Sequence, residues 1–255
     1  MRWPLFLLAA LLLCLPFSSI PVWAEDSGDM ALEFPKGTNP PPTDMVSHIY
    51  NPKYDFMVRK AVVTWPRPFN FQVMRAFYAN TRQYDPLGES TLKKLAELSY
   101  AVETAGNQQN KERLAGEYKD LVLNHLAHID VVLQALSLAR DNPLYGDPAF
   151  YEWVVKGLEN EILSSTKGRT MRDAYSLVTM GEEALILNRL GAKSVYMELV
   201  SDGLHFYNIH LAEDFETHKQ YELFMDTTRP MRRLKNAYNA VDGPARKLDL
   251  RASHK

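Results

Sequence analysis

The spacing of hydrophobic residues along the chain changes once, and each region predicts a different kind of element. Between residues 66 and 168, apolar residues recur every three or four positions, which is typical of helices that bury one face. Between residues 174 and 226, they gather in short runs rich in β-branched and aromatic side chains, which favours strands. The pattern therefore predicts an α+β fold that is predominantly α, with helical hairpins first and a small antiparallel sheet after them.

Four helices are expected in the first region. They cover about residues 68–81, 90–106, 109–140 and 147–168. Ser90 and Asp147 are predicted N-caps, and Pro148 follows at a helical position where its missing N–H costs little. Residues 109–140 carry one continuous apolar stripe and are expected to form the longest helix. Antiparallel helices joined by short turns resemble a tetratricopeptide-like stack in architecture, although no repeat of that period is present.

The second region predicts a strand and a short helix before the main sheet. Residues 174–178 have the composition of a strand. Thr179 and Glu182 have the spacing of a capping box, which opens a helix that ends near Gly191. A later strand and a final helix are expected at residues 221–226 and after Pro230.

A β-hairpin is the clearest local signal in this region. Its two strands are expected at residues 194–201 and 204–211. Only Asp202-Gly203 separates them, a dipeptide typical of a two-residue turn. Such a turn places Leu199 opposite Phe206 and puts Asn208 and His210 on one face of the sheet.

The first 24 residues have the order of a cleavable secretory signal. Arg2 gives a positive start, residues 5–15 are almost wholly apolar, and the small Ala24 marks the expected cleavage site. The apolar run is too short to cross a bilayer, which takes about 20 residues. A lipid anchor on Cys14 is disfavoured because the large Leu13 precedes it. The mature protein is therefore expected in the periplasm or outside the cell.

The composition of the remaining chain predicts three segments: a leader, a globular domain and a tail. Residues 25–45 combine low hydrophobicity with glycine and proline, which predicts a flexible leader. Residues 46–240 are expected to form a single globular domain, helical to about residue 168 and mixed α+β over 169–240. Residues 241–255 form a polar tail.

The charge and cysteine content narrow the range of possible functions. Cleavage after Ala24 would remove Arg2 and the single cysteine, leaving 28 Lys and Arg against 31 Asp and Glu. Without cysteine the mature chain has neither disulfides nor thiol chemistry. Its near-neutral charge disfavours nucleic-acid binding, which takes a basic surface, and no later apolar run predicts a membrane span.

Two histidines are candidates for metal or ligand binding. His125 and His128 have the spacing at which two imidazoles on one helix can share a metal. Asp130 would point about 140° away from His125, so a third ligand is missing. We therefore predict no metal site and no cofactor. His125 lies on the apolar stripe, and a buried histidine with a hydrogen bond is favoured over a ligand-binding one.

Glu183 is the most informative carboxylate. Leu187 and Leu190 follow it at helical spacing, so Glu183 faces the buried side of its helix, where a carboxylate must be paired or hydrogen-bonded. We interpret it as a strut that bonds Tyr175 or the turn at Gly168. A catalytic acid or a ligand clamp is the alternative.

Asn208 and His210 complete the candidate set. They share a strand face with Met197 and Leu199, which is expected to pack on the helices; opening to a ligand is the alternative. The candidate ligand-binding residues are therefore Glu183, Asn208, His210 and His125, and no catalytic residue is predicted.

Several short motifs in residues 162–234, and more weakly from residue 69, resemble those of a family of exported bacterial proteins, domain of unknown function 4919. The motifs are Ser164-Ser165-Thr166-Lys167-Gly168, Ala174-Tyr175, Glu183 before Leu187-Asn188-Arg189-Leu190-Gly191, and Phe206-Tyr207-Asn208. The chain differs at Ser165-Thr166, where the family has a glycine before Lys167. The resemblance implies an exported, helix-rich domain with no established activity.

The sequence has no nucleophile motif: G-x-S-x-G, H-E-x-x-H and a glycine-rich phosphate loop are all missing. An enzyme is therefore not favoured. We predict a non-catalytic periplasmic module that binds an envelope protein or another cell-surface component. The alternative is a hydrolase or metal-binding protein with a cleft between the helices and the sheet. Aromatic residues could stack on sugars only if several are exposed on one face, which the sequence does not reveal.

Overall fold

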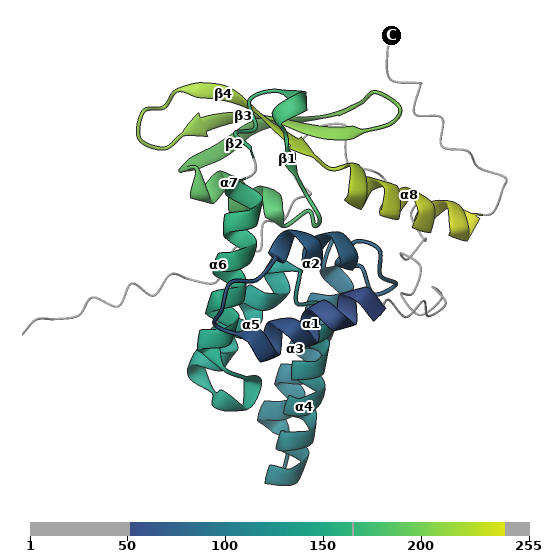
Figure 1. The fold of residues 1–255 in the computed structure, drawn as a ribbon, viewed down its shortest axis with the longest axis vertical. Coiled ribbons are helices and arrows are strands. Elements are labelled where there is room, and N and C mark those ends of the chain that lie inside the picture. Colours follow the sequence, from purple (N-terminus) through teal and green to yellow (C-terminus); the bar gives the residue numbers. More distant parts are fainter. Residues whose placement is uncertain (1–51, 165, 243–255) are drawn as a thin grey trace, which may run out of the picture. The chain divides into compact units, whose positions relative to one another are not determined.

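Six α-helices precede the first strand, one lies between the first and second strands, and one follows the last strand in this computed structural model, which describes residues 52–164 and 166–242, with side chains to residue 238 (Figure 1). The α-helices are α1 (Pro52–Thr64), α2 (Phe71–Tyr78), α3 (Glu89–Thr104), α4 (Gln108–Asn124), α5 (Ile129–Asp141), α6 (Pro148–Ser164), α7 (Glu182–Arg189) and α8 (Thr228–Asp242). The strands are β1 (Tyr175–Ser176), β2 (Ala192–Ser201), β3 (Phe206–Asp214) and β4 (Gln220–Asp226), and the 3-10 helices are η2 (Pro143–Tyr145) and η3 (Met171–Asp173). The predicted α+β class is confirmed. The predicted signal, the leader and residues 243–255 of the tail lie outside the described residues.

Local capping explains where several helices begin. The side chain of Asp147 accepts a hydrogen bond from the Ala149 N–H at 2.9 Å, as its position before Pro148 predicts. The prediction for Ser90 is wrong, because α3 begins one residue earlier and the Ser90 hydroxyl donates to Asp85 instead. None of the helices within residues 52–164 and 166–242 is both long and apolar enough to cross a membrane.

The expected long helix over residues 109–140 is wrong. The chain forms α4 and α5 instead, with a turn at residues 125–128 between them. Two buried tyrosines stabilise this turn: the Tyr54 hydroxyl accepts from the Ala127 N–H at 3.3 Å, and the Tyr78 hydroxyl lies 2.9 Å from His125 Nδ1. Tyr54 belongs to α1, a helix that the sequence did not predict. Contacts from distant helices therefore interrupt a locally continuous apolar stripe.

The sheet is mixed, which corrects the expected antiparallel arrangement. Its strand order is β1-β4-β3-β2. The pairs β2–β3 and β3–β4 are antiparallel, but the two-residue β1 runs parallel to β4, with Tyr175 opposite Met225. The strand β2, which is ten residues long, therefore lies at one edge of the sheet.

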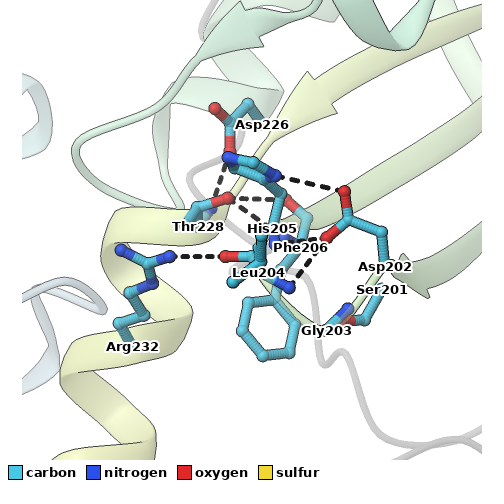
Figure 2. Close-up of polar contacts among 9 residues, drawn as sticks. All are labelled: Ser201, Asp202, Gly203, Leu204, His205, Phe206, Asp226, Thr228 and Arg232. Atoms are coloured by element: carbon cyan, nitrogen blue, oxygen red, sulfur yellow. Dashed lines mark hydrogen bonds and ion pairs between the residues drawn. The ribbon is translucent and has the colours of Figure 1, made fainter.

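The expected two-residue turn at Asp202-Gly203 is also wrong. The connection between β2 and β3 is the four residues 202–205. Figure 2 shows how Asp202 organises this loop: its Oδ1 accepts from the N–H groups of Leu204 and His205 at 2.8 and 2.6 Å. Arg232 of α8 donates to the Leu204 carbonyl, so the loop is attached to the last helix. An Asx turn thus replaces the type I′ turn that the dipeptide favours.

The longer loop shifts the hairpin register by two residues. Leu199 lies opposite Asn208 rather than Phe206, and Met197 lies opposite His210. A shift of two keeps every side chain on its predicted face, because successive residues of a strand alternate between faces. Beyond Met197 a β-bulge adds Val195 between the paired residues Ser194 and Tyr196.

Candidate functional site

Two adjacent carboxylates begin α7, and both are buried. Glu182 is fully buried and Glu183 is 8% exposed. The predicted capping box is not formed, because the Thr179 hydroxyl has no hydrogen-bond partner among the described residues. Successive helical residues point about 100° apart, so the two carboxylates reach different neighbours.

Glu182 forms a buried ion pair with Arg75 of α2. Its Oε2 lies 2.7 Å from Arg75 Nη2 and also accepts from the Val178 N–H at 2.9 Å. The same guanidinium nitrogen donates to the Ser176 carbonyl of β1 at 3.1 Å. Burial raises the pKa of Glu182, and the charge of Arg75 opposes that shift. The ion pair therefore joins α2 of the helical half to β1 and α7.

Asp130 lies against the loop before α7. A Cβ atom at Gly181 would be 1.8 Å from Asp130 Oδ2, so any larger residue would displace this carboxylate. Burial, together with the charge of Glu182, raises the pKa of Asp130 to about 6. Asp130 is thus a second carboxylate beside the ion pair. Among the described residues no cation lies at hydrogen-bond distance from it, and His128 Nδ1 is 3.9 Å away.

Glu183 faces the sheet, where it meets two of the other predicted residues. Its Oε1 accepts from Asn208 Nδ2 at 2.6 Å, and its Oε2 lies 3.4 Å from His210 Nε2. Asn208 and His210 are 3% and 2% exposed on β3. The predicted burial of Glu183 is confirmed, but its expected bonds to Tyr175 or the Gly168 turn are wrong. Asn208 and His210 are its partners.

Ser194 extends this group to the surface and was missed by the sequence analysis. Its exposed side chain places Oγ 2.9 Å from His210 Nδ1 and 3.2 Å from the Tyr196 carbonyl. The adjacent bulge at Val195 places Ser194 on the same face as His210, whereas regular alternation would place it on the other face. We call Glu183, Asn208, His210 and Ser194 the Glu183 cluster.

The Glu183 cluster has the order hydroxyl, imidazole, carboxylate that activates a serine nucleophile. The Ser194 hydroxyl has one proton, which can go either to His210 Nδ1 or to the Tyr196 carbonyl. If Ser194 donates to His210, Nε2 carries the other ring proton and faces Glu183. If Ser194 donates to Tyr196, the single ring proton of a neutral His210 lies on Nδ1. Nε2 then has no proton to donate to the Glu183 carboxylate. The first arrangement is a relay, and the second is a structural network.

His125 lies apart from the other predicted residues. It closes α4 and bonds Tyr78, while His128 is fully buried with neither ring nitrogen hydrogen-bonded among the described residues. Burial lowers the pKa of both histidines to about 4, so both rings are neutral near pH 7. Within residues 52–164 and 166–242, no three His, Cys, Asp or Glu side chains are grouped to hold a metal.

A cleft of about 650 Å³ lies between the start of α2 and the second half of α6. Phe69, Phe71 and Trp153 form its aromatic wall, with ring centroids 4.9 to 5.8 Å apart. Gly157 makes this wall possible, because a Cβ there would be 2.0 Å from the Phe71 ring. Phe69 and Trp153 remain partly exposed. We call this the α2/α6 cleft.

Amide and carboxylate side chains line the rest of the α2/α6 cleft. Gln72, Asn160 and Glu161 lie there, and their side chains make no hydrogen bond or ion pair with any described residue. Asn70 uses its Oδ1 to cap α2, which leaves its amide N–H₂ group available. Lys156 also lines the cleft and pairs with Glu152 at 2.8 Å. This site was not predicted from the sequence, because its residues come from two separate helices.

Comparison with known proteins gives no relative: no family model, no curated protein and no solved structure matches the chain. The resemblance to domain of unknown function 4919 therefore stays a prediction.

Proposed function

We propose that this protein is a non-catalytic binding module of the cell envelope, exported by its signal segment, and that it holds a saccharide in the α2/α6 cleft. The observation that carries the proposal is the combination of partly exposed aromatic rings with polar side chains that have no partner in the described residues. Ligand sites in proteins have this composition, an apolar wall with a few convergent polar groups.

A sugar ring matches both kinds of group. One face of a pyranose presents C–H bonds, which stack on an aromatic ring such as Trp153. Its rim carries hydroxyl groups, each of which donates and accepts. The amides of Gln72 and Asn160 offer a donor and an acceptor in one plane, and Glu161 offers acceptors.

The charge of the α2/α6 cleft favours a neutral ligand. Lys156 and Glu161 are its only ionisable lining residues within the described chain, and their formal charges cancel. Phosphate and nucleic acid are disfavoured, because their recognition relies on clustered Arg and Lys. A saccharide without charged substituents fits the lining best.

A fluorescence titration tests this proposal, because Trp153 lies in the α2/α6 cleft. Soluble oligomers of N-acetylglucosamine and of glucose serve as probes, and we expect one series to change the emission of the full chain in a saturable way. Trp153→Ala removes this fluorophore, so its binding is followed by isothermal titration calorimetry, and the variant should not bind. Trp65→Ala is the matched control, since Trp65 packs on Phe150 outside the cleft lining and its loss should leave binding intact. No binding by either series, or binding that survives Trp153→Ala, would contradict the proposal.

A hydrolase is the second candidate, and the order of Ser194, His210 and Glu183 is the observation that favours it: Ser194 is hydrogen-bonded to His210, and His210 Nε2 lies 3.4 Å from Glu183 Oε2. It ranks lower because none of these residues lines the α2/α6 cleft, and three of the four cluster residues are almost fully buried. A fluorophosphonate probe followed by intact mass measurement separates the two functions. The binding-module proposal predicts no adduct on Ser194. An adduct that disappears in both Ser194→Ala and His210→Gln would favour the hydrolase.

A further inference from the structure

The edge strand β2 has no neighbour on its outer side among the described residues. The order β1-β4-β3-β2 leaves the ten residues of β2 paired with β3 alone. The opposite edge is different, because β1 is only two residues long. A long free edge presents unpaired backbone N–H and C=O groups to any strand that approaches.

Four apolar side chains of β2 are exposed, and they occupy both faces of the sheet. Val195, Tyr196 and Met197 are 50%, 57% and 40% exposed, and Leu199 is also exposed. Edge strands are usually protected by several charges, prolines or bulges; β2 has two charges, Lys193 and Glu198, one bulge at Val195 and no proline. These two charges have opposite signs, which suits a partner with the same sequence.

The β2–β3 register fixes which β2 residues share a face. Lys193, Tyr196 and Glu198 pair with Glu213, Leu211 and Ile209, which are alternate residues of β3. The three β2 residues therefore occupy consecutive places on the same face, because the bulge absorbs Val195. Tyr196 lies midway between Lys193 and Glu198.

We propose that two copies of this chain pair along β2, antiparallel and about a two-fold axis at Tyr196. A two-fold axis normal to a sheet keeps each residue on its own face, so the central residue meets its own copy. With Tyr196 at the centre, Lys193 lies opposite Glu198 of the second copy, and the reverse pair repeats on the other side. Tyr196 packs on Tyr196, and the two sheets join into one.

The side chains at this edge are available for the pairing. Glu198 has no ion-pair or hydrogen-bond partner among the described residues. Lys193 bonds Glu213 at 2.9 Å, but its side chain is still 54% exposed, and its ammonium group has two further protons to donate. The hairpin is also held in place before pairing, because Asp202 and Arg232 fix its loop (Figure 2). Association therefore orders few additional groups, so it costs little conformational entropy.

A disulfide test reads out the proposed register directly. Cα atoms of opposed residues in an antiparallel pair are roughly 4.5–5.5 Å apart, within the span of about 4.4–6.8 Å that a disulfide bridges. In a full chain with Cys14→Ser, mild oxidation should convert Tyr196→Cys into a covalent dimer. Leu204→Cys in the same hairpin is the matched control: it is 67% exposed but far from the axis, so it should stay unlinked.

Charge reversal tests the Lys193–Glu198 pair. Glu198→Lys replaces both attractive pairs with repulsive ones and should weaken dimerisation about tenfold in sedimentation velocity. Glu222→Lys makes the same change on the same face of β4, away from the edge, and should leave the dissociation constant unchanged. Mixing Glu198→Lys chains with Lys193→Glu chains should restore dimers.

Two outcomes would overturn the proposal. One is a chain that stays monomeric over the full concentration range, which would indicate that β2 pairs with a strand of another protein instead. The other is a dimer that Glu198→Lys does not weaken and that Tyr196→Cys does not capture, which would place the contact elsewhere.

Discussion

Glu182 and Glu183 are neighbours in sequence, yet they stabilise two different regions. Glu182 faces the helical half, where it meets a full positive charge, the guanidinium of Arg75, at 2.7 Å. Glu183 faces the sheet, where Asn208 donates to it at 2.6 Å and His210 lies 3.4 Å away. The helix α7 therefore connects the two regions through two different sides of its first turn. A pair of adjacent acidic residues can thus serve two interfaces rather than one catalytic site.

Removing Arg75 should have the largest effect, because Glu182 would remain buried without its cation. We expect Arg75→Met to lower the free energy of unfolding by about 3–5 kcal/mol in urea denaturation. Arg113→Met is the matched control: its partner Glu117 is exposed, and its loss should cost less than about 1 kcal/mol. The double variant Arg75→Met with Glu182→Leu should recover most of the loss. If Arg75→Met were as stable as the wild type, the ion pair would not join the two regions.

Acid should weaken the helical half through its buried histidines. Burial lowers the pKa of His128 to about 4, whereas an unfolded histidine titrates near 6.5. Between these values only the unfolded state takes up the proton, so stability falls as pH falls. The loss through His128 should be about 2 kcal/mol between pH 7 and pH 5. Asp130 acts in the opposite direction, because its raised pKa makes the folded state the better proton acceptor between pH 6 and 4.

The variant His128→Leu isolates this effect from Asp130. It lacks the titrating ring, so its free energy of unfolding should rise relative to that of the wild type by about 2 kcal/mol from pH 7 to pH 5. At pH 7 we expect the substitution to cost little stability, since neither ring nitrogen of His128 is hydrogen-bonded among the described residues. A stability difference that does not change with pH would mean that the pKa of His128 is the same in the folded and unfolded states.

Glu183→Gln should cost less than the loss of Arg75, because no full charge is left unpaired. It replaces a charge-assisted hydrogen bond to Asn208 with a neutral one. We therefore expect the free energy of unfolding to fall by about 1 kcal/mol in urea denaturation. Its effect on stability should exceed its effect on ligand binding. A loss of several kcal/mol would indicate that Glu183 pairs with a protonated His210.

Ser194→Ala should have the smallest effect. The side chain is exposed, and its bond to His210 contributes little to packing, so the free energy of unfolding should change by less than about 0.5 kcal/mol. Saccharide binding should not change either. Loss of any measured activity in Ser194→Ala, with the fold intact, would favour the hydrolase.

The features predicted from sequence are those set by nearby residues. The start of α6 follows from Asp147 and Pro148, and the burial of Glu183 follows from Leu187 on the same helix; Leu190 is the C-cap and is exposed. Asn208 and His210 fall on their predicted face because a two-residue register shift preserves the alternation.

The features that the sequence missed depend on distant contacts. The turn at residues 125–128 depends on Tyr54 and Tyr78, far earlier in the chain. The partner of Glu182 is 107 positions away. Ser194 meets His210 beside a bulge, and regular alternation along a strand gives no signal for an inserted residue.

Parallel calorimetric binding and thermal melting measurements on Trp153→Ala and Glu183→Gln decide between the two sites, with N-acetylglucosamine and glucose oligomers as probes. We expect Trp153→Ala to abolish saccharide binding in a protein that still folds. We expect Glu183→Gln to lower the melting temperature and to keep the binding. The reverse result, a Glu183→Gln protein that melts normally but no longer binds, would contradict the proposed function and place the functional site at the Glu183 cluster.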